Sequence, residues 1–116
     1  MKGELPNLYP LAPAALHILM ALAAEDLHGY GIMLAVARES EKRYRLGPGT
    51  LYDNLDRLMK QGLVEEAAQR KDEHSRRIYY RLTSSGRRVF SAEITRLETM
   101  VRNARAYLNA PRTRRA

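Results

Sequence analysis

Cysteine and tryptophan are absent from this chain of 116 residues, and it contains a single phenylalanine. The absence of cysteine excludes disulfide frameworks, thiolate zinc sites and cysteine nucleophiles. It also agrees with a reducing compartment, and we expect a cytoplasmic protein. The apolar segment from Leu11 to Ala24 is interrupted by Pro13 and His17, and it is shorter than the ~20 residues that span a bilayer. We interpret it as a buried first helix rather than a secretory signal, and we expect no membrane partner.

Acidic residues are scarce toward the carboxyl terminus. The formal net charge is +7, with −2 over residues 1–37, +3 over residues 38–83 and +6 over residues 84–116. Such a distribution suits a polyanionic partner, although a soluble protein with a basic tail has the same charge pattern. The hydrophobic share of 45% is enough for a packed core. The length allows one domain, or one small domain with a long arm.

No arrangement of residues for catalysis or metal binding stands out. The three histidines, His17, His28 and His74, fall on different predicted elements and have no second ligand at metal spacing. The segment from His28 to Gly31 is not a phosphate-binding loop, since no strand precedes it and no Gly-Lys-Ser follows. We therefore expect no enzyme activity, no metal and no cofactor.

Hydrophobic periodicity predicts a mainly α fold with a small β-wing. Helices are expected at about residues 13–24 and 29–39, from near Pro48 to Gly62, and from Thr83 or Ser84 to Leu108. Residues 25–30 are expected to form a turn, and strands are expected at about 63–69 and 76–83. In the first helix the predicted apolar stripe is Leu16, Leu19, Met20 and Ala23. This order predicts an arm (1–11), a winged helix-turn-helix domain (12–83), a C-terminal dimerisation helix (84–108) and a basic tail (109–116).

The third predicted helix has one apolar and one polar face. Its core-facing residues, at i, i+4, i+7 and i+8, are Leu51, Leu55, Leu58 and Met59. The residues expected to contact DNA are Gly49, Thr50, Tyr52, Asn54, Arg57 and Lys60. Asp53 and Asp56 share the outer face, four residues before Arg57 and Lys60. They could hold those cations in place, or the helix could be an ordinary surface helix with paired charges.

The expected hairpin turn is crowded with positive charge. Its cations are Arg70, Lys71, Arg76 and Arg77, diluted by Asp72 and Glu73. Clustered cations repel each other unless a polyanion neutralises them. On a wing they contact phosphate or the minor groove and add affinity rather than sequence choice. We favour this interpretation over a solvated turn, and on the following strand we expect Tyr80 in the core.

The last predicted helix carries an apolar seam with steps of 4, 3, 4, 3 and 4 residues. Its members are Phe90, Ile94, Leu97, Val101, Ala104 and Leu108. This is the a/d pattern of a coiled coil. A helix of this length cannot bury the whole seam on a small domain, so we expect these residues to form a homodimer interface.

Four stretches, in order, carry a resemblance to a known family: Leu27–Ile32, Gly49–Leu58, Gly62–Val64 and Arg76–Gly86. Together they resemble the start of helix 2, the recognition helix, the strand entry and the wing exit of PadR-type transcriptional regulators. This family is named for the control of phenolic acid decarboxylase. The resemblance covers roughly residues 11–108.

The resemblance implies a bacterial-type repressor with a winged-helix domain and a C-terminal dimerisation helix. It also implies DNA contacts by Tyr30 and Tyr52 and wing contacts by Arg76 and Arg77. Asp53 departs from the pattern, because the family usually has proline there. Some relatives bind flat aromatic ligands at the dimer interface through tryptophan, which this chain lacks, so that activity is not expected.

We therefore predict a homodimeric, sequence-specific regulator of double-stranded DNA that acts as a repressor on a pseudo-palindromic operator. Its two recognition helices would enter successive major grooves about 34–36 Å apart. A small-molecule effector in the dimer interface is one way to change that separation, and the sequence identifies no such molecule. Two other classes remain: a winged helix that mediates protein–protein contacts without DNA, and a small ligand-binding protein or enzyme.

Overall fold

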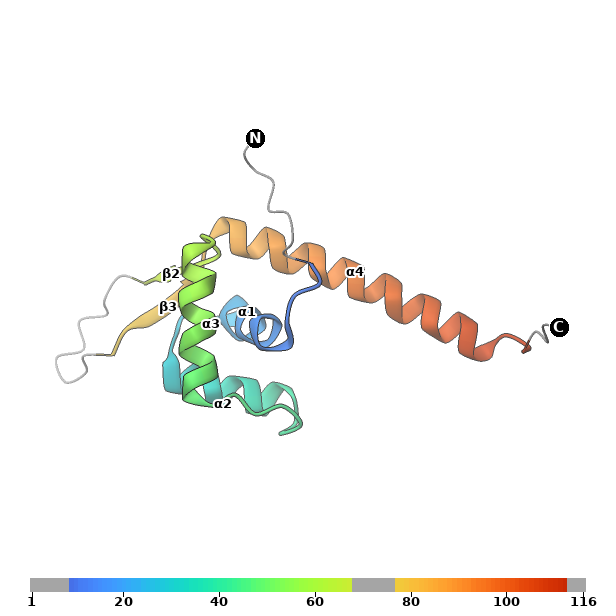
Figure 1. Ribbon diagram of the computed structural model, residues 1–116, viewed down its shortest axis with the longest axis horizontal. Helices are drawn as coiled ribbons and strands as arrows, with labels where there is room; N and C mark the ends of the chain where they lie inside the picture. The colour runs from blue at the N-terminus through green and yellow to red at the C-terminus, as the bar shows by residue number, and fades with distance from the viewer. Residues whose placement is uncertain (1–8, 68–76, 113–116) are drawn as a thin grey trace.

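The computed structural model describes residues 9–67 and 77–112 of the chain. Helices α1 (Pro13–Ala24), α2 (Gly29–Glu39) and α3 (Pro48–Lys60) pack together, and α4 (Ser84–Asn109) leaves them as a long rod (Figure 1). Strands β1 (Leu27–His28), β2 (Val64–Glu66) and β3 (Tyr79–Leu82) form an antiparallel sheet in the order β1-β3-β2. The rod makes the molecule elongated, with extents of 69 × 39 × 22 Å.

The predicted fold class is confirmed, and the helix bounds agree within one or two residues. The third helix ends at Lys60, and Gly62 follows with φ +75°, in the left-handed region that glycine adopts without a steric penalty. The strands are shorter than predicted, and the expected turn contains β1, whose Leu27 pairs with Tyr80 of β3. The tip of the predicted hairpin lies outside the described residues.

Helix α1 is the centre of the core, and its predicted single stripe was wrong. The buried residues of α1 are Ala14, Ala15, Ile18, Leu19, Ala21 and Leu22, so only Leu19 of the expected stripe is fully buried. The physical reason is that α2, α3, α4 and β3 all contact α1 and together cover more than one of its faces. Its alanines let these neighbours approach closely. Tyr80 lies in the same core, as predicted.

Helix α4 has a docked part and a projecting part. Thr83 caps its start, because its hydroxyl accepts the Gly86 N–H at 3.0 Å and donates to the Gly62 carbonyl at 2.6 Å. Val89 and Glu93 are buried against the domain, whereas every residue from 98 to 109 is exposed. The first turns of the expected dimerisation helix therefore belong to the core of the same chain. Within residues 9–67 and 77–112, no helix has the length and apolar character needed to cross a membrane.

Candidate nucleic-acid interface

The outer face of α3 is exposed at the end of the molecule opposite the free end of α4 (Figure 1). Leu51, Leu55 and Leu58 are buried, and α3 packs with this side on α1 and α2. Burial of these leucines leaves five predicted contact residues on the surface: Gly49, Thr50, Tyr52, Arg57 and Lys60. This helix can therefore present its polar side to a partner without disturbing the core.

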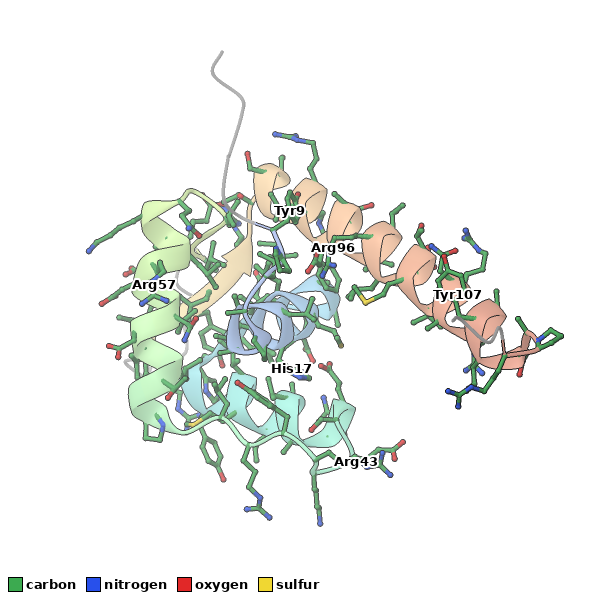
Figure 2. All side chains as sticks on the ribbon, turned by 45° about the vertical axis from the view of Figure 1, so that its right-hand side comes forward. Tyr9, His17, Arg43, Arg57, Arg96 and Tyr107 are labelled. Atoms are coloured by element: carbon green, nitrogen blue, oxygen red, sulfur yellow. The ribbon has the colours of Figure 1, made fainter. Side chains whose placement is uncertain are left out.

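Helix α3 carries two cations, Arg57 and Lys60. Among the described residues, neither forms an ion pair with Asp53 or Asp56. The structure therefore contains neither acidic residues that hold these cations in place nor an ordinary surface helix with paired charges. Figure 2 shows Arg57 on α3, where it borders a cavity of about 200 Å³ next to the N-terminal arm. Unpaired surface cations are the groups that contact phosphate most readily.

Asn54 differs from expectation, because it is buried, with 9% of its surface exposed. Its side-chain Nδ2 donates to the carbonyl of Thr50 at 2.8 Å. Residues of the N-terminal arm and of α1 line the same small cavity as Asn54 on this side of α3. The expected DNA contact of Asn54 is therefore not supported by its position.

Tyr30 and Tyr52, from two different helices, lie at a shared concavity. They are 61% and 47% exposed, and Tyr52 reaches across to the start of α2. A methyl group added at Gly29 would overlap the Tyr52 hydroxyl and come within 2.9 Å of its Cζ. The tyrosine concavity, as we call it, has a volume of about 340 Å³ and is lined by His28, Gly29, Tyr30, Tyr52, Arg77, Ile78 and Tyr80. Three of the predicted DNA contacts, on α2, α3 and the segment before β3, thus meet in one place.

His28 belongs to this concavity and was missed by sequence reasoning. Its Nδ1 accepts the Gly31 N–H at 3.0 Å as the cap of α2, and its Nε2 lies 3.1 Å from Nη1 of Arg77. A neutral imidazole that accepts at Nδ1 carries its proton on Nε2. The 3.1 Å contact holds the guanidinium of Arg77 beside the ring at this concavity. In the sequence, the position of His28 directly before the glycine that starts α2 indicates a role as a helix cap.

The charge state of His28 follows from its surroundings. Burial, followed by the positive charge of Arg77, lowers the pKa of His28 below its ordinary value. The ring is therefore neutral at pH 7, in the state that caps α2. The other expected wing cations, Arg70, Lys71 and Arg76, lie outside the described residues. Arg77 is exposed at the foot of the wing.

The projecting part of α4 carries the rest of the predicted seam. Ile94, Val101 and Leu108 are 39%, 52% and 83% exposed, Ala104 is exposed and Leu97 is half-buried. Ile94, Leu97 and Val101 form one wall of an open concavity of about 660 Å³, which Glu98, Arg102 and Arg105 complete. Phe90 differs from the others because it packs against the core of its own chain. Its predicted place in a dimer interface is therefore not supported by its position.

In the part of the chain that the structure describes, no three acidic or histidine side chains are placed to hold a metal ion. The polar groups that line the tyrosine concavity are the His28 ring, the Arg77 guanidinium and tyrosine hydroxyls. The carboxylates of Glu66 and Asp56 lie close enough to contribute, after burial and Tyr52, to the raised pKa of Tyr80. The polar groups of the concavity can bind an anion by hydrogen bonds and charge.

Comparison with known proteins agrees with this geometry. Residues 18–92 match the family described as "Transcriptional regulator PadR-like family". Transcriptional regulator Rv3488 of Mycobacterium tuberculosis is 35% identical over 91 residues, which cover 78% of this chain and 81% of that protein. A 37.1 kDa protein in transposon TN4556 of Streptomyces fradiae is 39% identical over 80 residues, which cover 69% of this chain and 21% of that protein.

Solved structures show the same fold. A PadR family transcription regulator from Clostridium difficile has a TM-score of 0.70 at 22% identity, covering 84% of this chain and 100% of that one. A PadR-like transcriptional regulator from Bacillus cereus has a TM-score of 0.71 at 18% identity, covering 84% and 92%. A transcriptional regulator from Clostridium thermocellum has a TM-score of 0.70 at 24% identity, covering 83% and 90%.

Proposed function

Because this chain belongs to the PadR-like family of DNA-binding transcriptional regulators rather than to an enzyme family, we propose that it is a cytoplasmic, homodimeric repressor. It would bind a pseudo-palindromic operator in double-stranded DNA. The observation that carries the proposal is the exposed outer face of α3, which carries Arg57 and Lys60 and whose Tyr52 lines the tyrosine concavity together with Arg77.

Helix α3 is the element that would enter the major groove. Gly49 and Thr50 are exposed in its first turn, where a small side chain lets the backbone approach a base or a phosphate closely. Tyr52 and Lys60 extend from the same helix, and Arg57 can reach a phosphate or a guanine edge. Sequence choice would come from these residues, because in this arrangement they would lie nearest the base edges.

The tyrosine concavity would hold a backbone phosphate. The His28 ring and the Arg77 guanidinium lie 3.1 Å apart there, measured from Nε2 to Nη1, and Tyr30 and Tyr52 line the same concavity. The guanidinium can donate charge-assisted hydrogen bonds to a phosphate oxygen at this concavity. Such contacts position the protein on the duplex and carry little sequence information.

The projecting part of α4 would pair with a second copy of the chain. Its exposed apolar residues repeat with heptad spacing, and Val101 and Leu108 are 52% and 83% exposed. A partner helix that covers this seam removes apolar surface from water. Release by a small-molecule effector would act through the same helix pair, because the pairing sets the separation of the two α3 helices.

The test is selection of bound fragments from genomic DNA, followed by affinity measurements over a range of salt concentrations. A protein that contacts Z phosphates loses affinity with a slope near −0.9Z in log–log form. We expect Arg77→Ala to weaken binding to all duplexes alike and to flatten this slope by about one unit. Binding that is absent or insensitive to salt would instead favour a winged helix that contacts proteins.

The chain provides a matched control for Arg77. Arg81 is an exposed arginine of β3, and its Nε is held by Glu65 at 2.8 Å across the sheet. Arg81→Ala removes the same formal charge from the same part of the fold. We expect it to leave the salt slope nearly unchanged. Equal effects of the two substitutions would mean that net charge, and not a phosphate contact by Arg77, determines affinity.

A further inference from the structure

Glu93 is a carboxylate with no exposed surface in an otherwise apolar contact between α4 and the domain. A buried charge costs free energy unless donors surround it. The Glu93 oxygens accept three hydrogen bonds: from Arg96 Nε at 2.7 Å, from Arg96 Nη2 at 2.8 Å and from the Leu11 backbone N–H at 3.0 Å. Two come from one guanidinium in a fork, which fixes the orientation of the carboxylate.

The third donor connects α4 to the opposite end of the chain. Leu11 precedes α1 and packs against the core, and the hydroxyl of Tyr9 lies 3.5 Å from the Val89 carbonyl one turn earlier on α4. Figure 2 shows Tyr9 and Arg96 on the side of α4 that faces the N-terminal arm. Residues 9–11 therefore form a strap between the start of α1 and the rod.

Glu93 sits where the rod leaves the domain. It is the last fully buried residue of α4, and from residue 98 onward every residue is exposed. The helix ends at Asn109, sixteen positions beyond Glu93, which corresponds to roughly 24 Å at 1.5 Å per residue. A small rotation of α4 at Glu93 is therefore amplified along the part of the rod that would form the dimer.

We propose that Leu11, Glu93 and Arg96 form an arm–rod latch that fixes the direction of α4 relative to α3. In this role Glu93 is a positioning residue, and it determines which half-site spacing the dimer accepts. The consequence for operator spacing rests on the dimeric function proposed above. The direction of α4 within one chain does not depend on that function. An apolar residue at position 93 would bury equally well, but it could not accept the Leu11 N–H and would leave the strap unattached.

The direction of α4 can be measured without DNA and without assuming a dimer. Because the chain has no cysteine, Asp56→Cys on α3 and Asn103→Cys on the rod provide two exposed sites for spin labels. Labelled chains are diluted into unlabelled protein, so that pulsed electron paramagnetic resonance measures the distance within one chain. We expect a single narrow distribution, which Glu93→Gln broadens and Glu98→Gln, an exposed position on the same helix, leaves unchanged. An unchanged distribution both in Glu93→Gln and in the apolar double variant described next would overturn the latch.

A second variant covers the case in which Glu93→Gln fails to fold. Glu93→Leu combined with Arg96→Leu leaves no buried charge, and such apolar replacements of an ion pair commonly fold well. It nevertheless lacks the acceptor for Leu11. We expect a folded protein with a broad distance distribution, and a narrow one in this variant would show that packing alone directs the rod.

The functional readout is the choice of half-site spacing. Operators are compared in which the half-sites are moved together or apart by one base pair. We expect wild-type protein to prefer one spacing, and we expect the affinity ratio between spacings to approach unity in Glu93→Gln. A uniform loss of affinity at every spacing would mean that Glu93 only stabilises the fold. If wild-type protein binds no DNA at all, the proposed function fails, while the distance measurement still decides the latch.

Discussion

Gly29 and Tyr52 are coupled at the level of single residues, because the tyrosine ring occupies the space that a side chain at position 29 would need. We expect Gly29→Ala to displace Tyr52 while the fold persists, since the ring is half-exposed and can move. Operator affinity should fall about as much as in Tyr52→Ala. Double-mutant cycles on the two positions measure this, because a shared cause makes the two losses non-additive. Additive losses would show that the two residues affect DNA binding separately.

The ionisation of Glu93 leads to a prediction of how the free energy of unfolding depends on pH in the acidic range. Its hydrogen bonds from Arg96, with the Leu11 N–H, outweigh burial and lower the pKa of Glu93 below its ordinary value. A depressed pKa means that the stabilisation is complete above the ordinary carboxylate pKa and is lost as pH falls through the folded-state pKa. We expect Glu93→Gln to lower the free energy of unfolding by about 1–3 kcal/mol at pH 7.

That deficit should shrink as the pH falls below the ordinary carboxylate pKa of about 4, because the carboxyl group is then protonated in the unfolded chain while folded Glu93 stays ionised until its lowered pKa is reached. Urea unfolding at constant protein concentration, followed by circular dichroism at pH 7, 5 and 3, provides the comparison. Glu98→Gln is the control for the loss of one surface carboxylate from the same helix. A deficit that is the same at every pH would mean that ionisation of Glu93 contributes nothing to stability.

At the level of elements, the sequence predicted the helices better than it predicted their surroundings. Residues such as Leu51, Leu55 and Leu58 repeat with helical spacing and are buried as expected. The prediction of a single buried stripe on α1 was wrong because a helix surrounded by neighbours buries several faces. Hydrophobic periodicity predicts only one buried face. Strand β1 was not foreseen because it is two residues long and depends on pairing with β3, which is distant in sequence.

The projecting part of α4 allows its own prediction. Val101 is 52% exposed in the single chain, so Val101→Glu should leave the fold intact. In a coiled-coil seam, the same substitution places two carboxylates in an apolar contact, and we expect monomers. Thr99→Glu adds the same charge to the opposite side of the helix and should remain dimeric. Size-exclusion chromatography with light scattering decides this, and dimers of Val101→Glu would show that α4 pairs through another surface.

At the level of the whole molecule, the sequence indicated which parts would meet but not how they are joined. Tyr30, Tyr52 and Arg77 were each predicted, and the structure brings them to one concavity. The position of His28 before the glycine that starts α2 indicates a cap, but its contact with Arg77 depends on the fold and could not be predicted from the sequence. Asn54 was misplaced for a related reason, since only the fold shows that residues of the N-terminal arm line the same small cavity.

The same overall arrangement predicts how binding depends on operator geometry. A dimer joined through α4 would present two α3 helices to one face of the duplex, about one helical turn apart. Inserting five base pairs between the half-sites turns one of them to the opposite face, and we expect affinity to fall to that of a single half-site. Inserting the same five base pairs outside the operator is the control. Electrophoretic mobility shifts measure the effect, and undiminished binding to the half-turn insertion would mean that the two recognition helices are not held at a fixed separation.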